Sequence, residues 1–206
     1  MALSKGIFCL EGAWDQNRDL TNRLSVEQQL RMFEGAGICQ VIHRDVATRP
    51  EFEHYLKEWL KRKYTPYPLG YLAFHGSRGT LSIGGTDVTL EELTDIIGLG
   101  RARDRILYFG SCSTMAAPEA DLRAFCHQTG AKAIVGYTRQ VDWMESAAFD
   151  CLLVPKLLTA ISVKPVFTSL EKDYPSFVRR LGLRIATTKW ATGRTIAEAV
   201  APSLAA

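Results

Sequence analysis

Two residues that could act together as a nucleophile and a base follow apolar stretches in the middle of the chain. His75 comes directly after the apolar run 71–74 and is followed by Gly76, and Cys112 comes shortly after the apolar run 106–109. A thiolate attacks carbonyl carbon, and a nearby imidazole can take up the thiol proton, so the pair is suited to acyl transfer. The backbone N–H groups of Gly76 and Cys112 are candidate donors to an oxyanion.

These residues can meet only if a sheet brings the ends of two strands together. Short apolar runs at 6–10, 38–42, 69–74, 105–109 and 131–135 are typical of buried strands, and amphipathic helix patterns lie between them. This alternation predicts a mostly parallel sheet with right-handed crossovers and helices on both faces. Reactive groups collect at the carboxyl ends of such strands, and consecutive strands are usually neighbours, so we expect His75 and Cys112 to face each other.

Helix start signals fall between the expected strands. Ser25 is expected to cap a first helix and Pro50 to open a second. Thr89 and Glu92 have the spacing of a capping box, and Pro118 opens a fourth helix.

The remaining segments are less regular. Residues 78–83 are expected to form a small hairpin arm, and 146–161 a long apolar helix. A helix around 174–181 and a last strand at 183–188 are expected to follow, and 195–206 is read as a short helix or a frayed tail.

Length and composition predict one globular domain spanning residues 1–206, with a core over 6–161 that 162–206 complete. The chain is 47% apolar and 23% charged, which argues against disorder. A net charge of +3 is too small for extensive phosphate neutralisation, so we expect no nucleic-acid partner. No signal-peptide core and no run of about 18 apolar residues is seen, so we expect a cytoplasmic protein without a membrane partner.

The five cysteines lack Cys-x-x-Cys spacing, which disfavours a disulfide framework and a zinc site. Cys112 lies beyond a strand among small polar residues and is the candidate nucleophile, whereas the others are expected to be buried packing residues: Cys9, Cys39, Cys126 and Cys151.

We expect no cofactor, because the chain has neither a Gly-x-Gly-x-x-Gly nor a Walker motif. His43-Arg44-Asp45 has the order of a kinase catalytic loop, but Pro50 stands where a metal-binding asparagine is needed, so we reject a kinase.

A hydrophobic strand ending in His-Gly, and 37 positions after its histidine a cysteine that follows a second strand, resembles the caspase-like, clan CD cysteine peptidases. Residues 130–137, followed by Val141-Asp142-Trp143, are similar to the strand and loop after the nucleophile in CHAT and separase-type members. The resemblance covers roughly residues 6–158 and points to a small bacterial branch. It implies an α/β three-layer sandwich with a mostly parallel caspase-like (flavodoxin-like) sheet.

The same resemblance implies roles for particular residues. Cys112 is the implied nucleophile and His75 the general base and acid, with the Gly76 and Cys112 backbone as oxyanion hole. Asp142 or Glu145 would contact a basic side chain on the amino side of the cleaved bond, the P1 position, although either could instead cap the helix near 146.

Two further features bear on specificity. Trp14 and Asp15 follow the first strand and are expected to shape the substrate groove. The caspase pentapeptide Gln-Ala-Cys-x-Gly is replaced by Gly-Ser-Cys-Ser-Thr at 110–114, which argues against a true caspase and its aspartate specificity.

The leading hypothesis is therefore a cysteine endopeptidase acting on a protein or peptide substrate. One alternative is a catalytically silent caspase-like interaction module, and another is a flavodoxin-like signalling domain with a redox-sensitive Cys112. For an active peptidase we expect regulation by an activating partner chain or by homodimerisation.

Overall fold

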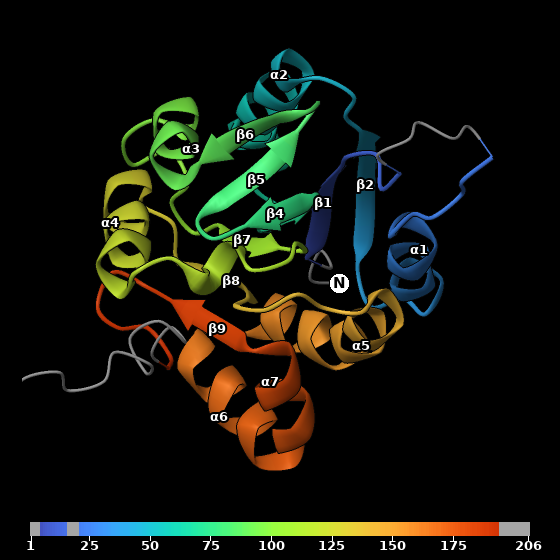
Figure 1. Cartoon of the computed structure of the whole chain (residues 1–206), viewed down its shortest axis with the longest axis vertical. Helices are drawn as coiled ribbons and strands as arrows, with labels where there is room; N and C mark the ends of the chain where they lie inside the picture. Colours follow the sequence, from blue (N-terminus) through green and yellow to red (C-terminus); the bar gives the residue numbers. More distant parts are fainter. Residues whose placement is uncertain (1–4, 16–20, 194–206) are drawn as a thin grey trace, which may run out of the picture.

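The computed structural model describes residues 5–15 and 21–193. Its main sheet has six strands. This sheet lies between two layers of helices (Figure 1). The sheet order is β2-β1-β3-β7-β8-β9, and only β9 runs antiparallel to its neighbour. The α/β class and the mostly parallel sheet are confirmed. The strands are β1 (Gly6–Glu11), β2 (Gln40–Asp45), β3 (Leu69–Ala73), β7 (Ile106–Phe109), β8 (Ala133–Tyr137) and β9 (Leu183–Ala186).

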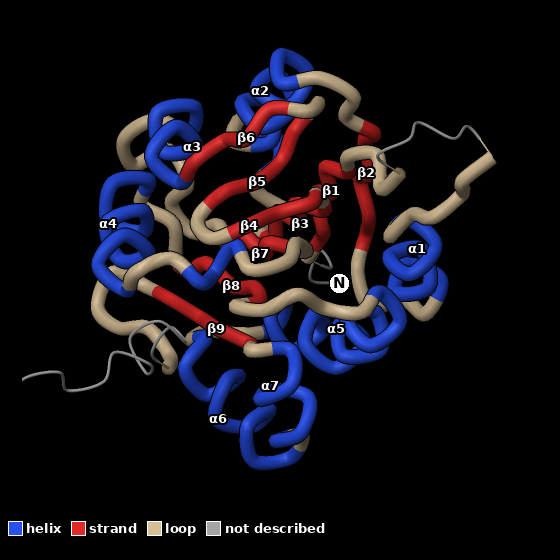
Figure 2. The backbone as a smooth tube through the Cα atoms, in the orientation of Figure 1, coloured by secondary structure: helices blue, strands red, loops and turns tan. Residues whose placement is uncertain are grey.

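Helices cover both faces of this sheet (Figure 2). One face carries α1 (Glu27–Gly35), α5 (Trp143–Thr159), α6 (Val163–Asp173) and α7 (Pro175–Leu181). The other carries α2 (Arg49–Trp59), α3 (Leu90–Ile97) and α4 (Glu119–Thr129). Short 3-10 helices lie at Arg62–Tyr64 and Thr114–Ala116.

The alternation of side chains along buried strands divides the interior into two cores. In β1, Ile7 and Cys9 face the core under α1 and α5, whereas Phe8 and Leu10 face the core under α2 and α3. Every residue of β1 is buried, as expected for a strand covered on both sides.

A second, antiparallel sheet follows β3 directly. It consists of β4 (His75–Ser77), β5 (Thr80–Ile83) and β6 (Thr86–Thr89), and its apolar residues Leu81 and Val88 join the core beneath α2 and α3. The expected hairpin arm at 78–83 therefore includes the middle strand of a three-stranded sheet, and His75 is the first residue of that sheet.

Several helix expectations are refined by the structure. Thr89 forms the expected capping box. Ser25 also caps α1 as expected, because its hydroxyl accepts the Glu27 N–H at 3.0 Å, although the regular helix starts only after Val26. The long helix begins at Trp143, and it continues through Pro155. Helix α6 was not expected, and the segment 195–206 lies outside the described residues.

None of the helices within 5–15 and 21–193 combines the length and apolar character needed to cross a bilayer.

Candidate active site

His75 and Cys112 are brought together because β3 and β7 are neighbouring parallel strands. Leu72 pairs with Phe109, so the loops after both strands emerge at the same edge of the sheet. Both residues line one cavity of about 210 Å³. The cavity is also lined by Trp14, Leu24, Val26, Gln29, Tyr71, Tyr108, Gly110, Ser111, Tyr137, Val141, Trp143, Ser146, Ala147 and Asp150.

The imidazole of His75 is oriented by the main chain of Trp14. Its Nε2 lies 2.9 Å from the Trp14 carbonyl oxygen, and the indole ring packs edge-on against the imidazole with centroids 5.4 Å apart. A carbonyl oxygen can only accept, so Nε2 carries a proton and donates it. In the neutral ring, Nδ1 is then left with the lone pair that a general base needs.

Cys112 is half-buried, and its sulfur accepts a hydrogen bond from the Val141 backbone N–H at 3.5 Å. The next residue, Ser113, adopts a left-handed backbone with φ of 57°, and its N–H donates to the Arg139 carbonyl at 2.9 Å. A non-glycine residue in this conformation is costly and tends to occur at functional turns. Within the described segments, no hydrogen bond joins the side chains of Cys112 and His75, and the Cys112 N–H donates to no protein group.

The second sheet braces the loop that carries Cys112. Thr114 donates its hydroxyl to the Thr80 carbonyl at 2.9 Å, and the Gly79 N–H donates to the Thr114 carbonyl at 3.1 Å. Gly76 passes so close that a Cβ there would stand 2.4 Å from Thr114 Oγ1 and 2.9 Å from the Cys112 carbonyl oxygen. Only glycine fits at this position, and it places the backbone of residue 76 against the loop that carries Cys112.

A buried carboxylate, Asp150, lines the cavity from helix α5. It is 1% exposed, and three tyrosine hydroxyls surround it: Tyr71 lies 2.5 Å from Oδ2, and Tyr108 and Tyr137 both approach Oδ1. Burial raises the pKa of Asp150 from 3.8 to about 6, although the three hydroxyls oppose this by stabilising the anion. The site therefore contains an acid that ionises close to neutral pH.

The acids expected from the sequence occupy other positions. Asp142 is exposed and caps α5, accepting the Glu145 N–H at 3.0 Å, which is the alternative considered for it. Glu145 forms an ion pair with Arg180 at 2.9 Å. Neither these two nor Asp15 is among the described residues that line the cavity, whereas Trp14 does line it.

The sequence does not predict Asp150 as a site residue, because the residues around it have the pattern of a long apolar helix. Its partners come from strands 13 to 79 residues away in the sequence, which no local spacing reveals. The only available signal was an acidic residue within the otherwise apolar stretch 147–154.

The other cysteines differ from Cys112. Cys9, Cys39 and Cys126 are buried as expected, and burial raises the pKa of the Cys39 thiol to about 11 and that of Cys126 to about 12. The expectation of a buried Cys151 is wrong, because Cys151 lies on the exposed side of α5, where its sulfur contacts the Ala147 carbonyl.

The chain belongs to a family of unknown function, DUF6642, whose model matches residues 4–186. No curated protein matches the sequence.

Proposed function

We propose that this protein is a caspase-like cysteine peptidase in which Cys112 is the nucleophile and His75 the general base and acid. The observation that carries the proposal is that both residues line one cavity at the carboxyl ends of adjacent parallel strands, with His75 oriented by the Trp14 carbonyl. The resemblance of the His-Gly and Ser-Cys strand ends to clan CD peptidases supports the same assignment.

The reaction begins when His75 Nδ1 takes the proton of the Cys112 thiol and the thiolate attacks the peptide carbonyl carbon. The Cys112 N–H, which has no protein acceptor among the described residues, and the Gly76 N–H stabilise the oxyanion. When the intermediate collapses, the C–N bond breaks, and His75 gives its proton to the leaving amine. Water then attacks the thioester and passes a proton to His75, and the acid product leaves as the thiol is restored.

The cavity favours a long basic side chain at the P1 position. Trp14 and Trp143 form part of its wall, with ring centroids 4.8 Å apart, and would contact the methylene groups of lysine or arginine. Asp150 supplies the negative charge that would pair with the cationic end. In this proposal Asp150 takes the role expected of Asp142 or Glu145.

Hydrolysis of fluorogenic peptides that differ only at P1 tests both parts of the proposal. We expect cleavage after arginine or lysine, its abolition in Cys112→Ser, and a loss of roughly 100- to 10,000-fold in His75→Ala. Asp150→Asn should reduce cleavage after basic residues much more than cleavage after norleucine. Cys151→Ser is the matched control, because that thiol is exposed and is not among the cavity residues, and it should remain fully active.

Two results would contradict the proposal. Activity that persists in Cys112→Ser would assign the cleavage to another group or to a contaminant. A wild-type protein that binds peptides in this cavity without cleaving any of them would favour the silent interaction module instead.

A further inference from the structure

A buried carboxylate at the end of β1, outside the cavity lining, is held by four donors. Glu11 is 3% exposed. Its Oε1 accepts from the Val26 N–H at 2.8 Å and from the indole N–H of Trp14, and its Oε2 accepts from Ser25 Oγ and His43 Nε2, both at 2.7 Å. Burying an ionised carboxylate costs free energy unless its charge is compensated, so the groups that compensate Glu11 need to be identified.

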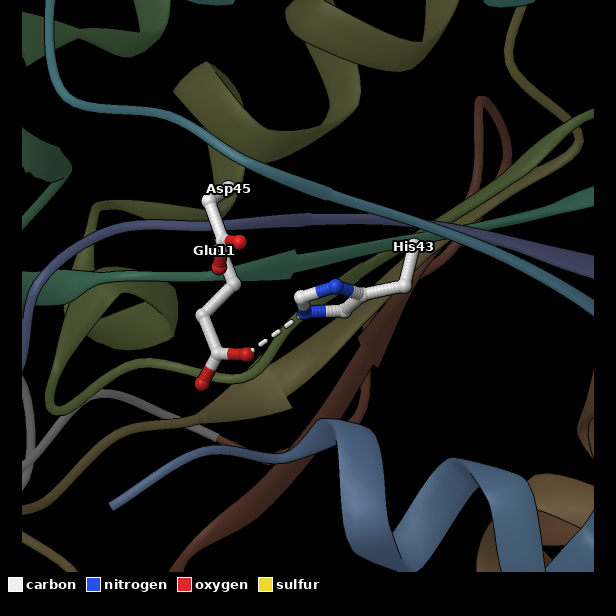
Figure 3. Close-up of side chains that lie close together, drawn as sticks. All are labelled: Glu11, His43 and Asp45. Atoms are coloured by element: carbon white, nitrogen blue, oxygen red, sulfur yellow. Dashed lines mark hydrogen bonds and ion pairs between the residues drawn. The ribbon is translucent and has the colours of Figure 1, made fainter. Parts of the chain in front are cut away.

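His43 compensates the charge of Glu11. Cys9 of β1 is the register partner of His43, so the imidazole lies beside the end of β1, where Figure 3 shows it pointing at Glu11. Its other nitrogen, Nδ1, lies 3.8 Å from a Glu27 oxygen. Burial alone would lower the pKa of His43, but Glu11, with Glu27 and Asp45, outweighs it and raises the pKa above 6.5. Burial would raise the pKa of Glu11, but its hydrogen bonds lower it overall.

The same cluster has the composition of a metal site but not its free ligand atoms. Oxygen or nitrogen atoms of Glu11, His43 and Asp45 lie within 4.8 Å of one another. Each Glu11 oxygen already accepts two hydrogen bonds, which uses the lone pairs that a cation would need. The donors around Glu11 therefore point to a structural anion rather than to a metal ligand.

Trp14 connects this carboxylate to the candidate base. Its indole N–H donates to Glu11, while its carbonyl oxygen accepts from His75 Nε2. The sheet hydrogen bonding of this strand continues to the Gly12 N–H, which donates to the Ala73 carbonyl at 2.9 Å. Trp14 lies two residues beyond the last sheet hydrogen bond of this strand, so the sheet does not fix its backbone directly. The hydrogen bond from its indole N–H to Glu11 therefore helps to fix the position of its carbonyl group.

We propose that Glu11, held by His43, is a positioning residue that fixes the protonated nitrogen of His75 by way of Trp14. With the indole anchored, the Trp14 carbonyl faces Nε2 and selects the tautomer in which Nδ1 is free to accept the thiol proton. When the anchor is released, the carbonyl shifts, and His75 samples the other tautomer and other ring orientations. The kinetic part of this inference rests on the proposed peptidase function, whereas the tautomer part does not.

Nitrogen-15 NMR of the histidine rings tests the tautomer directly. The chain has four histidines, and a His75→Gln spectrum identifies the signals of His75. In the wild type we expect Nε2 of the neutral ring to be protonated and Nδ1 to be unprotonated. In Trp14→Phe, which keeps an aromatic ring and the carbonyl but removes the donor to Glu11, we expect averaged signals from both tautomers.

Variants of the anchor itself extend the test. Glu11→Ala should behave like Trp14→Phe, and Glu11→Gln should retain the wild-type tautomer because its amide oxygen can still accept from the indole. Glu27→Gln is the matched control, since it removes another of the carboxylates near His43 without touching Trp14, and His75 should be unchanged. If Glu11→Ala does not fold, Trp14→Phe alone decides.

The kinetic readout separates positioning from substrate binding. For peptides with a basic P1 residue, we expect kcat to fall roughly 10- to 100-fold in Glu11→Ala while KM changes little, with recovery in Glu11→Gln. A single Nε2-protonated tautomer in Trp14→Phe would overturn the inference, whatever the activity of the protein. Absence of peptide hydrolysis in the wild type, with the expected tautomer shift in Trp14→Phe, would overturn the proposed function and leave the positioning role intact.

Discussion

Asp150 should make the folded protein less stable as the pH rises from about 4 to 7. Burial raises the pKa of Asp150 from 3.8 to about 6, so the native carboxyl keeps its proton over a range in which the unfolded chain has lost it. The native state then binds more protons than the unfolded state, and the free energy of unfolding declines with pH. At roughly 1.4 kcal/mol per pH unit, ionisation of this group costs about 3 kcal/mol by pH 7.

Comparison with Asp150→Asn isolates this contribution. We would measure the free energy of unfolding by urea for both proteins at half-unit intervals from pH 4 to 7.5. The asparagine cannot ionise, so the difference between the two proteins cancels the titration of every other group. We expect the wild type to lose up to about 3 kcal/mol relative to Asp150→Asn across this range, mostly below pH 7.

A second variant checks the cause of the shift in the pKa of Asp150. The Tyr137 hydroxyl lies 3.0 Å from Asp150 and stabilises the anion, so Tyr137→Phe should raise the pKa of Asp150 further and extend the decline to higher pH. Parallel stability curves for the wild type and Asp150→Asn would refute the reasoning, as would a wild type that gains stability relative to the variant with rising pH.

Two further predictions concern the cavity. In Gly76→Ala, the new Cβ would displace the Cys112 loop, so kcat/KM should fall at least about 100-fold while the fold is retained. Gly35→Ala is the control and should be fully active, because a Cβ at that position meets nothing within 4 Å. Equal activity of the two variants would disprove the close approach of Gly76 to the Cys112 loop. The ratio of kcat/KM for a lysine P1 peptide to that for its norleucine analogue should rise as the pH passes about 6, because ionisation of Asp150 creates the charge that attracts lysine. A ratio independent of pH would remove Asp150 from P1 recognition.

The sheet and the two central residues follow from the sequence because their signals are local. Apolar runs mark the strands, and the neighbouring positions of β3 and β7 follow from the tendency of consecutive strands to lie side by side. His75 and Cys112 stand at the ends of those strands, so topology alone brings them to one edge. The capping role of Asp142 was also accessible, because Glu145 follows at the spacing of a helix cap.

The polar interior was not accessible from the sequence, because it depends on contacts between distant segments. Asp150 is surrounded by tyrosines from three strands, and their hydroxyl groups all lie against this one carboxylate. In the sequence, these tyrosines stand in apolar strands and Asp150 in an apolar helix, so nothing local indicates that they meet. Glu11 and His43 end up together through the pairing of β1 with β2, 32 residues apart in the sequence. No pattern of neighbouring residues in the sequence indicates that Glu11 and His43 meet. The order His43-Arg44-Asp45 suggested only a kinase catalytic loop, which the rest of the sequence excludes.

The proposed peptidase is tested most directly by covalent labelling with an electrophilic peptide that carries lysine next to its reactive group. Cys112 and the exposed Cys151 are the two thiols that are not classed as buried, so Cys151 serves as an internal reference. Site-resolved mass spectrometry should find rapid modification of Cys112, slow modification of Cys151, and a large loss of the Cys112 rate in His75→Ala. Equal rates at the two cysteines, or a Cys112 rate unchanged in His75→Ala, would contradict the assignment of Cys112 and His75 as a catalytic pair.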